Sequence, residues 1–441
     1  MRWSREWRLV RGERAAAFAA LLSIGVTACL APAQAHSPTD FLVATGKKPA
    51  TTPWVPGRTF DRVAARLEKS FYSVAFQNTE LPGLVTEFRG AAHSAKSPAE
   101  EREVIWRFLT RIPATHLGLL SRPAYFALIN EIQGTSHPTL GLQLLRLEDR
   151  YFATMVFTGG PADSAGIRPW DEIVAVDQRS PGESPRLDWR SDDAYLGDER
   201  DPPTFGLVTA IGDRVNLTVA GESGRARDLW LTARLYSGLQ ASTQSLRLIE
   251  RDGVRIGYVH WWYLHARGLP EMLSKSLNGP LATSDALILD LRGRGGSGEV
   301  VPKLIALLAR GPAQRYEGPV VALVDRQTRS AKEMLATELR AQGLARVVGE
   351  PTAGAVVGAN FDDVGDSAIL MFPGTPVPPY TERLELRPTD PDVIVPWGGP
   401  YSGGRDPILE AGIDEAVRLV REKGPGHGTQ PTSRGRRGAL R

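Results

Sequence analysis

One serine of this sequence lies where an apolar segment passes into a helical pattern, in Val324-Asp325-Arg326-Gln327-Thr328-Arg329-Ser330-Ala331-Lys332-Glu333. Ser330 and Glu333 have the Ser-x-x-Glu spacing of a capping box, in which the serine only caps the helix and contributes about 1 kcal/mol. A serine at this position can instead be a nucleophile, because free amides and the positive end of the helix dipole lie beside it. This segment alone leaves both interpretations open.

Glycine is dense at the end of a second apolar segment, Leu289-Asp290-Leu291-Arg292-Gly293-Arg294-Gly295-Gly296-Ser297-Gly298. Glycine lets the backbone turn tightly and direct its N–H groups at one point, which suits the binding of an anion. The anion is either a phosphate or the oxyanion of an acyl-transfer intermediate. The run lacks the Lys-Ser/Thr ending of a P-loop, so it does not decide between them.

Both segments belong to a region in which strand and helix patterns alternate. We expect strands over 256–262, 286–289, 320–324, 345–348 and 368–372, and helices over 301–308 and 331–342. The alternation predicts an α/β domain over residues 245–423, built from crossover units on a mixed sheet. Chemistry in such sheets collects where strands end in loops, which is where both segments lie.

The preceding chain predicts helices first. One helix is indicated by helical spacing of the apolar residues Phe60, Val63, Leu67 and Phe71. A second begins where Ser97 can cap, Pro98 fits the first turn and Glu100 can close a capping box, with Val104, Ile105, Phe108 and Leu109 as its buried stripe. A third is expected after Ser121. These helices predict a small N-terminal helical domain over residues 57–135.

Short strand patterns with glycine turns follow, over 140–144, 151–157, 172–176 and 214–219. Between the second and third lie Gly160-Pro161-Ala162-Asp163-Ser164-Ala165-Gly166-Ile167 and Trp170-Asp171-Glu172-Ile173-Val174-Ala175-Val176-Asp177. Residues 138–236 resemble an inserted PDZ domain of the bacterial protease type. The resemblance implies a groove that binds an extended chain end, with backbone amides of Leu140, Gly141, Leu142 and Gln143 holding its carboxylate. The alternative is a PDZ-like fold used only as a spacer.

The glycine-rich strand end, the helix start at Ser330 and the segment Val347-Val348-Gly349-Glu350-Pro351-Thr352-Ala353-Gly354 occur in this order behind the PDZ-like region. Together they resemble the C-terminal processing (tail-specific) protease family, over residues from about 100 to 420. The resemblance implies that Ser330 is the nucleophile. It also implies an oxyanion hole formed by the amides of Ala331 and of Gly296 or, alternatively, Gly295.

One position departs from the pattern of many family members, which carry a lysine 25 residues after the serine. Here that position is Ala355, and no lysine occurs between Lys332 and Lys423. A Ser-Lys dyad is therefore not expected. The hydroxyl still needs a base near neutral pH, and histidine is the usual candidate.

His116, in Pro113-Ala114-Thr115-His116-Leu117-Gly118-Leu119-Leu120, resembles the base of the tricorn-type members of the family. Those members also use a glutamate near the end of the catalytic domain. Glu385, six residues before Pro391-Asp392, matches that motif and would orient the imidazole. The rival bases are His137, His260 and His265, and Glu382 is the nearest substitute for Glu385.

The first 35 residues have the order of an export signal: five arginines precede an apolar run that ends near small residues. Val26-Thr27-Ala28-Cys29 resembles a lipobox, which would make Cys29 a lipidated N-terminus; the alternative is cleavage after Ala35. Residues 36–56 are expected to be a linker. Because Cys29 is the only cysteine, neither an internal disulfide nor a cysteine-based metal site is expected in the mature chain.

Charge and composition narrow the function further. Residues 1–35 hold five Arg and two Glu, which accounts for the whole formal net charge of +3, so the composition gives no reason to expect nucleic-acid binding. The tail, residues 424–441, is rich in Gly, Pro and Arg and is expected to be disordered. No histidine pair has zinc-ligand spacing with a carboxylate partner, so no metal or cofactor is expected.

These features lead to one hypothesis and two alternatives. The hypothesis is an exported serine endopeptidase, periplasmic or otherwise extracytoplasmic, that acts on proteins or peptides and selects them through their C-termini. The first alternative is a non-catalytic protein that keeps the fold and binds peptides or apolar ligands, which the missing lysine supports. The second is a scaffold tethered to the membrane, which requires lipidation of Cys29.

Overall fold

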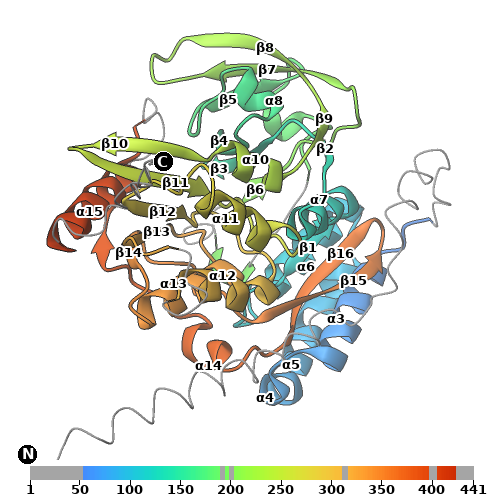
Figure 1. Ribbon diagram of the computed structural model, residues 1–441. Coiled ribbons are helices and arrows are strands. Elements are labelled where there is room, and N and C mark those ends of the chain that lie inside the picture. The colour runs from blue at the N-terminus through green and yellow to red at the C-terminus, as the bar shows by residue number, and fades with distance from the viewer. Residues whose placement is uncertain (1–52, 189–193, 198–202, 310–315, 397–404, 424–441) are drawn as a thin grey trace, which may run out of the picture.

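The computed structural model describes residues 53–188, 194–197, 203–309, 316–396 and 405–423 (Figure 1). The expected export signal, Cys29, the basic tail and nearly all of the expected linker lie outside these residues. Of the helices within the described ranges, none combines the length and the apolar character that a membrane span requires.

The largest α/β unit is a six-stranded sheet with the order β10-β11-β12-β13-β14-β17. Its strands are β10 (Arg247–Arg251), β11 (Val254–His260), β12 (Ala286–Asp290), β13 (Val320–Val324), β14 (Arg346–Gly349) and β17 (Val393–Ile394). β10 is antiparallel to β11 and the other pairs are parallel, so the sheet is mixed, as predicted. Parallel neighbours require crossover connections, which the intervening helices supply.

Helices cover both faces of this sheet (Figure 1). One apolar core joins the sheet to α11 (Leu269–Leu277), α12 (Val301–Leu308) and α13 (Ala331–Ala341). The other joins it to α15 (Pro407–Lys423). The central strands β12 and β13 are buried along their whole length, which explains why their sequences are continuous apolar runs.

The N-terminal helices do not form a core of their own. They are α3 (Arg58–Ser70), α4 (Val74–Thr79), α5 (Leu81–His93) and α6 (Pro98–Leu109). Ser97 caps α6 as predicted, and α7 (Arg122–Gln133) follows Ser121 as predicted, with Ser121 as its cap. The apolar side chains of these helices share one core with Val364, Leu370 and Phe372, which are far away in sequence. The helical segment and the C-terminal part of the chain are therefore one folding unit.

Those distant residues lie in a three-stranded antiparallel sheet of β1 (Gly118–Ser121), β16 (Ala368–Thr375) and β15 (Gly358–Gly365). The prediction that residues 368–372 form a crossover strand of the main sheet is wrong. They pair with β1 and β15 instead, because β15 and β16 are joined by a tight hairpin.

The β-rich region forms a separate sheet at the top of Figure 1, with the order β6-β3-β4-β5-β7-β8. Its strands are β3 (Leu142–Leu147), β4 (Arg150–Val156), β5 (Glu172–Val176), β6 (Thr204–Phe205), β7 (Arg214–Ala220) and β8 (Ala226–Thr232). The strands β2 (His137–Thr139) and β9 (Arg234–Tyr236) pair where the chain enters and leaves this region. The remaining elements are α8 (Pro161–Ser164), α10 (Gly238–Gln244), α14 (Tyr380–Leu384) and the 3-10 turns Pro181–Glu183, Ala194–Leu196 and Gly298–Val300.

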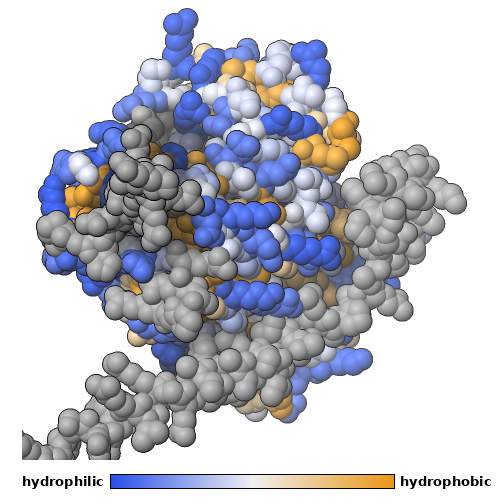
Figure 2. All heavy atoms as spheres, in the orientation of Figure 1, coloured by the Kyte–Doolittle hydropathy of each residue, from blue (hydrophilic) through white to orange (hydrophobic). Residues whose placement is uncertain are grey.

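Hydrophilic residues cover most of the face shown in Figure 2, and hydrophobic residues form small separate patches on it. Large apolar side chains exposed in the β-rich region include Trp230 on β8 and Leu235 on β9. Scattered exposure of this kind is ordinary for a folded protein.

Candidate active site

Ser330 lies between β13 and α13 and adopts an unusual backbone conformation, with φ of 55°. Its side chain makes no capping hydrogen bond, so the interpretation of Ser330 as a simple helix cap is wrong. Its amide donates to the carbonyl of Ala355 at 2.6 Å. Non-glycine residues in such conformations are costly and concentrate at functional sites.

Glu333, the expected capping-box partner, is fully buried and binds a different segment. Its carboxylate accepts hydrogen bonds from the amides of Gly354 at 3.1 Å and Ala355 at 3.0 Å, and from the hydroxyl of Thr352. Burial raises the pKa of Glu333 to about 7. Glu333 thus fixes the segment that receives the amide of Ser330.

Glu385 holds the next two residues of the same segment. Its Oε2 accepts from the amides of Val356 at 3.0 Å and Val357 at 2.9 Å. Its Oε1 accepts from the amide of Thr115 at 2.8 Å and from the Thr115 hydroxyl at 2.7 Å. The carboxylate is buried, and these four donors compensate for the loss of water. By contrast, Glu382, its suggested substitute, is exposed on α14.

His116 is buried and directly precedes the residues that lead into β1. Its Nδ1 lies 3.1 Å from Oγ1 of Thr115. Since that hydroxyl donates its single hydrogen to Glu385, it accepts from Nδ1–H of His116. This arrangement assigns the Nδ1–H tautomer and leaves the lone pair on Nε2, the form that a general base requires.

Thr115 is a site residue that the sequence analysis missed. Its only sequence signal is its place directly before His116. A threonine before a histidine does not by itself indicate that its hydroxyl connects the histidine to a carboxylate.

The three predicted catalytic residues are connected by one hydrogen-bonded path. The amide of Ser330 binds Ala355, and the next residue, Val356, donates to Glu385. Glu385 binds Thr115, whose hydroxyl contacts His116. Residues that are scattered over the sequence are thus held by a common network of buried groups.

The glycine-rich loop lies directly beside Ser330. A side chain at Gly295 would place its Cβ 2.7 Å from Cβ of Ser330. A side chain at Gly296, where φ is 142°, would place its Cβ 2.4 Å from the amide nitrogen of Leu264. Leu264 in turn donates to the carbonyl of Gly295 at 3.0 Å and accepts from Ser297 at 2.7 Å. Only glycine allows the loop to approach both neighbours this closely.

The amides expected to form an oxyanion hole are available in this arrangement. Among the hydrogen bonds of the described residues, none uses the N–H of Ala331, Gly295 or Gly296. Ala331 is the first residue of α13, where a helical amide has no partner within the helix. An anion bound near Ser330 could therefore be stabilised by these donors.

The other histidines are engaged elsewhere. His137 Nδ1 lies 3.4 Å from Oε1 of Glu131, and His265 Nδ1 lies 2.6 Å from the carbonyl of Glu131. His260 stacks on Trp262 with ring centroids 3.7 Å apart. Burial lowers the pKa of each of these histidines to about 4. A group with so low a pKa is a weak base at neutral pH.

The PDZ-like loop lies at one end of β3. The amide of Gly141 donates to Oγ1 of Thr139 at 2.9 Å, and the carbonyl of Leu140 accepts from the amide of Ala162 at 2.9 Å. Further along the same strand, β6 pairs with β3 at Leu144 and Leu145. The edge of β3 beyond Gln143 is thus already occupied by the chain itself.

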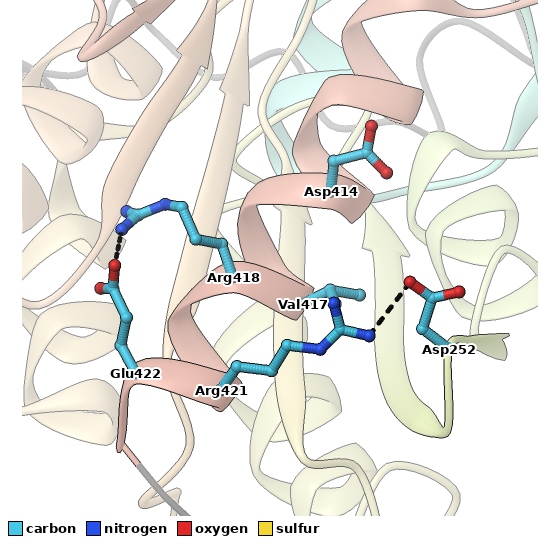
Figure 3. Close-up of a pocket in the computed structure, with 6 residues that line it drawn as sticks. All are labelled: Asp252, Asp414, Val417, Arg418, Arg421 and Glu422. Carbon is cyan, nitrogen blue, oxygen red and sulfur yellow. Dashed lines mark hydrogen bonds and ion pairs between the residues drawn. The ribbon is translucent and has the colours of Figure 1, made fainter.

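A surface hollow of about 480 Å³ lies elsewhere, against α15 and the turn between β10 and β11 (Figure 3). Its charged side chains pair with one another: Arg421 contacts Asp252 at 3.1 Å, and Arg418 contacts Glu422. None of its lining residues lies in a segment that carries Ser330, His116 or Glu385. In the described part of the chain, no group of three or more His, Cys, Asp or Glu side chains is arranged to hold a metal ion.

Comparison with known proteins relates this arrangement to peptidases. Residues 255–395 match the family model described as Peptidase family S41. The chain is 26% identical over 400 residues to Tricorn protease homolog 1 of Streptomyces coelicolor, a match that covers 82% of this chain and 35% of that protein. It is 27% identical over 264 residues to the carboxyl-terminal-processing protease of Picosynechococcus sp., covering 54% of this chain and 59% of that protein.

The fold is also similar to that of a solved structure, mature CPAF complexed with lactacystin. The TM-score is 0.50 at 13% identity, over 83% of this chain and 99% of that chain. The chain spans about a third of the length of the tricorn protease homologues that it matches. Residues 255–395 thus match the model of peptidase family S41, and the chain is similar in sequence to tricorn and carboxyl-terminal-processing proteases.

Proposed function

We propose that this chain is a serine endopeptidase in which Ser330 is the nucleophile, His116 the general base and Glu385 its support. The observation that carries the proposal is the hydrogen-bonded path from Ser330 through Ala355 and Val356 to Glu385, and on through Thr115 to His116. This path joins residues that are far apart in sequence, and it contains the buried carboxylate of Glu385 and an imidazole whose Nδ1 faces the Thr115 hydroxyl.

In the first step, Nε2 of His116 accepts the hydroxyl proton of Ser330 while Oγ attacks the peptide carbonyl. The resulting oxyanion accepts hydrogen bonds from Ala331 and from Gly296 or Gly295. His116 then gives its proton to the leaving amine, which leaves an acyl group on Ser330. Water attacks this ester, with His116 first accepting the proton from water and then returning it to Ser330.

Glu385 acts through Thr115 in this scheme. The carboxylate of Glu385 stabilises the imidazolium that forms on His116. Because the Thr115 hydroxyl donates to Glu385 and accepts from Nδ1–H of His116, it fixes the orientation of the imidazole. Ala355, which stands where the Ser-Lys members carry their lysine, accepts the amide of Ser330 and offers no base. The proposal therefore assigns proton transfer to histidine alone.

The proposed substrates are exported proteins or peptides, because the first 35 residues have the order of an export signal. Their C-termini would bind at the start of β3 and the loop before it, at Leu140, Gly141, Leu142 and Gln143 in the PDZ-like region. The pairing of β6 with Leu144 and Leu145 limits this contact to a short chain end, unless β6 is displaced.

Cleavage of an unstructured protein such as casein tests the activity. The wild-type chain should produce peptides that mass spectrometry detects, and Ser330→Ala should produce none. A peptide with a free C-terminus should be cleaved faster than its amidated form if the PDZ-like loop holds the carboxylate. Binding of such a peptide without any cleavage would favour a non-catalytic binding protein, the alternative that the missing lysine supports.

A further inference from the structure

Lys332 is the second residue of α13 and is fully buried, two positions after Ser330. Burying a lysine is expensive, because its ammonium loses the water that solvates it. Burial lowers the pKa of Lys332 to about 7, and the nearby carboxylates of Asp325 and Asp290 oppose that shift. The mechanism above gives this group no task, so its burial calls for a separate explanation.

The Lys332 ammonium binds two backbone carbonyls from different segments. Nζ donates to the carbonyl of Arg292 at 2.8 Å and to that of Trp262 at 3.1 Å. Arg292 is followed by Gly293, Arg294, Gly295 and Gly296, the loop that reaches Ser330. Trp262 is followed by Tyr263 and Leu264, and Leu264 holds the carbonyl of Gly295 and the amide of Ser297.

Lys332 thus ties three segments together: the helix that begins after the nucleophile, the glycine-rich loop, and the segment against which that loop rests. The third segment also contacts the β-rich region, because Trp262 and Tyr263 share an apolar cluster with Met155 and Phe157. A small shift of this loop would move the amides of Gly295 and Gly296 away from the proposed oxyanion. Catalysis is sensitive to the distance between such donors and the oxyanion.

We propose that Lys332 is a positioning residue that holds the oxyanion loop, residues 292–296, against the nucleophile helix by donating to the carbonyls of Arg292 and Trp262. The inference rests on the proposed function, because it assigns the loop its role in oxyanion binding. Lys332 does not act as the base of Ser330 in this proposal, since both of its hydrogen bonds go to backbone carbonyls.

The test compares Lys332→Met, which keeps the length of the side chain but removes its donors, with Lys303→Met. Lys303 lies exposed on α12, so its replacement removes one lysine charge without touching the loop. For peptide cleavage, Lys332→Met should lower kcat about tenfold to a hundredfold and leave KM within about twofold. Amide hydrogen exchange of residues 292–298 should become faster in Lys332→Met and stay unchanged in Lys303→Met.

Lys332→Gln serves as a second variant if Lys332→Met does not fold, because its amide keeps two N–H donors on a shorter side chain. Compared with the wild type, it should lower kcat less than about tenfold and speed amide exchange of residues 292–298 only slightly, and unchanged kcat with unchanged exchange would overturn the proposal if it is the only variant that folds. Unchanged kcat and unchanged loop exchange in Lys332→Met would overturn the proposal. Complete loss of activity with unchanged loop exchange would also overturn it, since Lys332 would then act on the reacting atoms. If the wild type cleaves no peptide, the proposed function fails, and loop exchange alone decides whether Lys332 positions the loop.

Discussion

Thr115 and Glu385 lie 270 residues apart in sequence and are joined by two hydrogen bonds to the same carboxylate oxygen, at 2.8 Å from the amide and 2.7 Å from the hydroxyl. The pair binds the segment before β1 to the end of α14. It also leaves the Thr115 hydroxyl as an acceptor for Nδ1–H of His116. One contact thus closes the fold and orients the proposed base.

Replacing Thr115 tests this relay. Thr115→Val keeps the shape of the side chain but removes the hydroxyl, so the imidazole loses its orientation and kcat should fall about a hundredfold. Thr115→Ser keeps the hydroxyl and should retain most of the activity. Steady-state peptide cleavage measures both variants, and equal loss in valine and serine variants would show that packing, not the hydroxyl, matters.

Replacing Glu385 by Gln should weaken both folding and catalysis. The new NH₂ group must face N–H or O–H donors that now point at a carboxylate oxygen, so the free energy of unfolding should fall by about 2 to 3 kcal/mol. Glu382→Gln, on the exposed side of α14, is the matched control and should change stability by less than about 0.5 kcal/mol. Chemical denaturation measures both, and similar stability of the two variants would contradict a buried four-donor carboxylate.

Gly296→Ala should damage the site through sterics alone. Its Cβ would lie 2.4 Å from the amide nitrogen of Leu264 in a backbone conformation that L-residues rarely adopt, so we expect a loss of about 2 to 4 kcal/mol and of activity. Gly298→Ala meets only Met334, at 3.5 Å, and should be tolerated. Thermal melting and peptide cleavage, measured for Gly296→Ala and Gly298→Ala, compare the stability and activity of the two variants. A fully active Gly296→Ala enzyme would exclude the proposed loop geometry.

The buried Lys332 should leave a mark on the pH dependence of stability. Burial lowers its pKa from 10.5 to about 7, so between these values the unfolded chain binds more protons than the folded chain. The contribution of Lys332 to the free energy of unfolding should therefore rise with pH above about 7, by of the order of 1 kcal/mol per pH unit, and be lowest below pH 7. Chemical denaturation of the wild type and of Lys332→Met from pH 6 to about 9.5 measures the difference between their free energies of unfolding. If the two free energies change with pH in parallel, the pKa of Lys332 is not lowered in the folded chain.

Much of the fold follows from local patterns that the sequence displays directly. Ser97 and Ser121 cap the helices expected after them, and the apolar runs at β12 and β13 become buried parallel strands. The prediction that residues 368–372 join the main sheet is wrong, since an apolar run does not specify its partners. One partner, β15, is adjacent in sequence, but the other, β1, lies far away, and pairing over such distances leaves no local signal.

Some residues of the candidate site could likewise be predicted from the sequence and others could not. Ser330, the glycine-rich loop, His116 and Glu385 carry recognisable motifs, whereas Thr115 and Lys332 do not. Their tasks depend on contacts with residues far away in sequence, Glu385 for Thr115 and Trp262 for Lys332. The alternative interpretation of Ser330 and Glu333 as a capping box is wrong for the same reason, because Glu333 binds Gly354 and Ala355 instead.

The central claim is that Ser330 is activated by His116. A fluorophosphonate probe reacts with activated serines, so the most direct measurement is labelling of the purified mature protein, of Ser330→Ala and of His116→Ala. The account predicts that the wild type is labelled at Ser330 and that both variants lose the label while remaining folded. An unlabelled, folded wild type, or full labelling of His116→Ala, would contradict it.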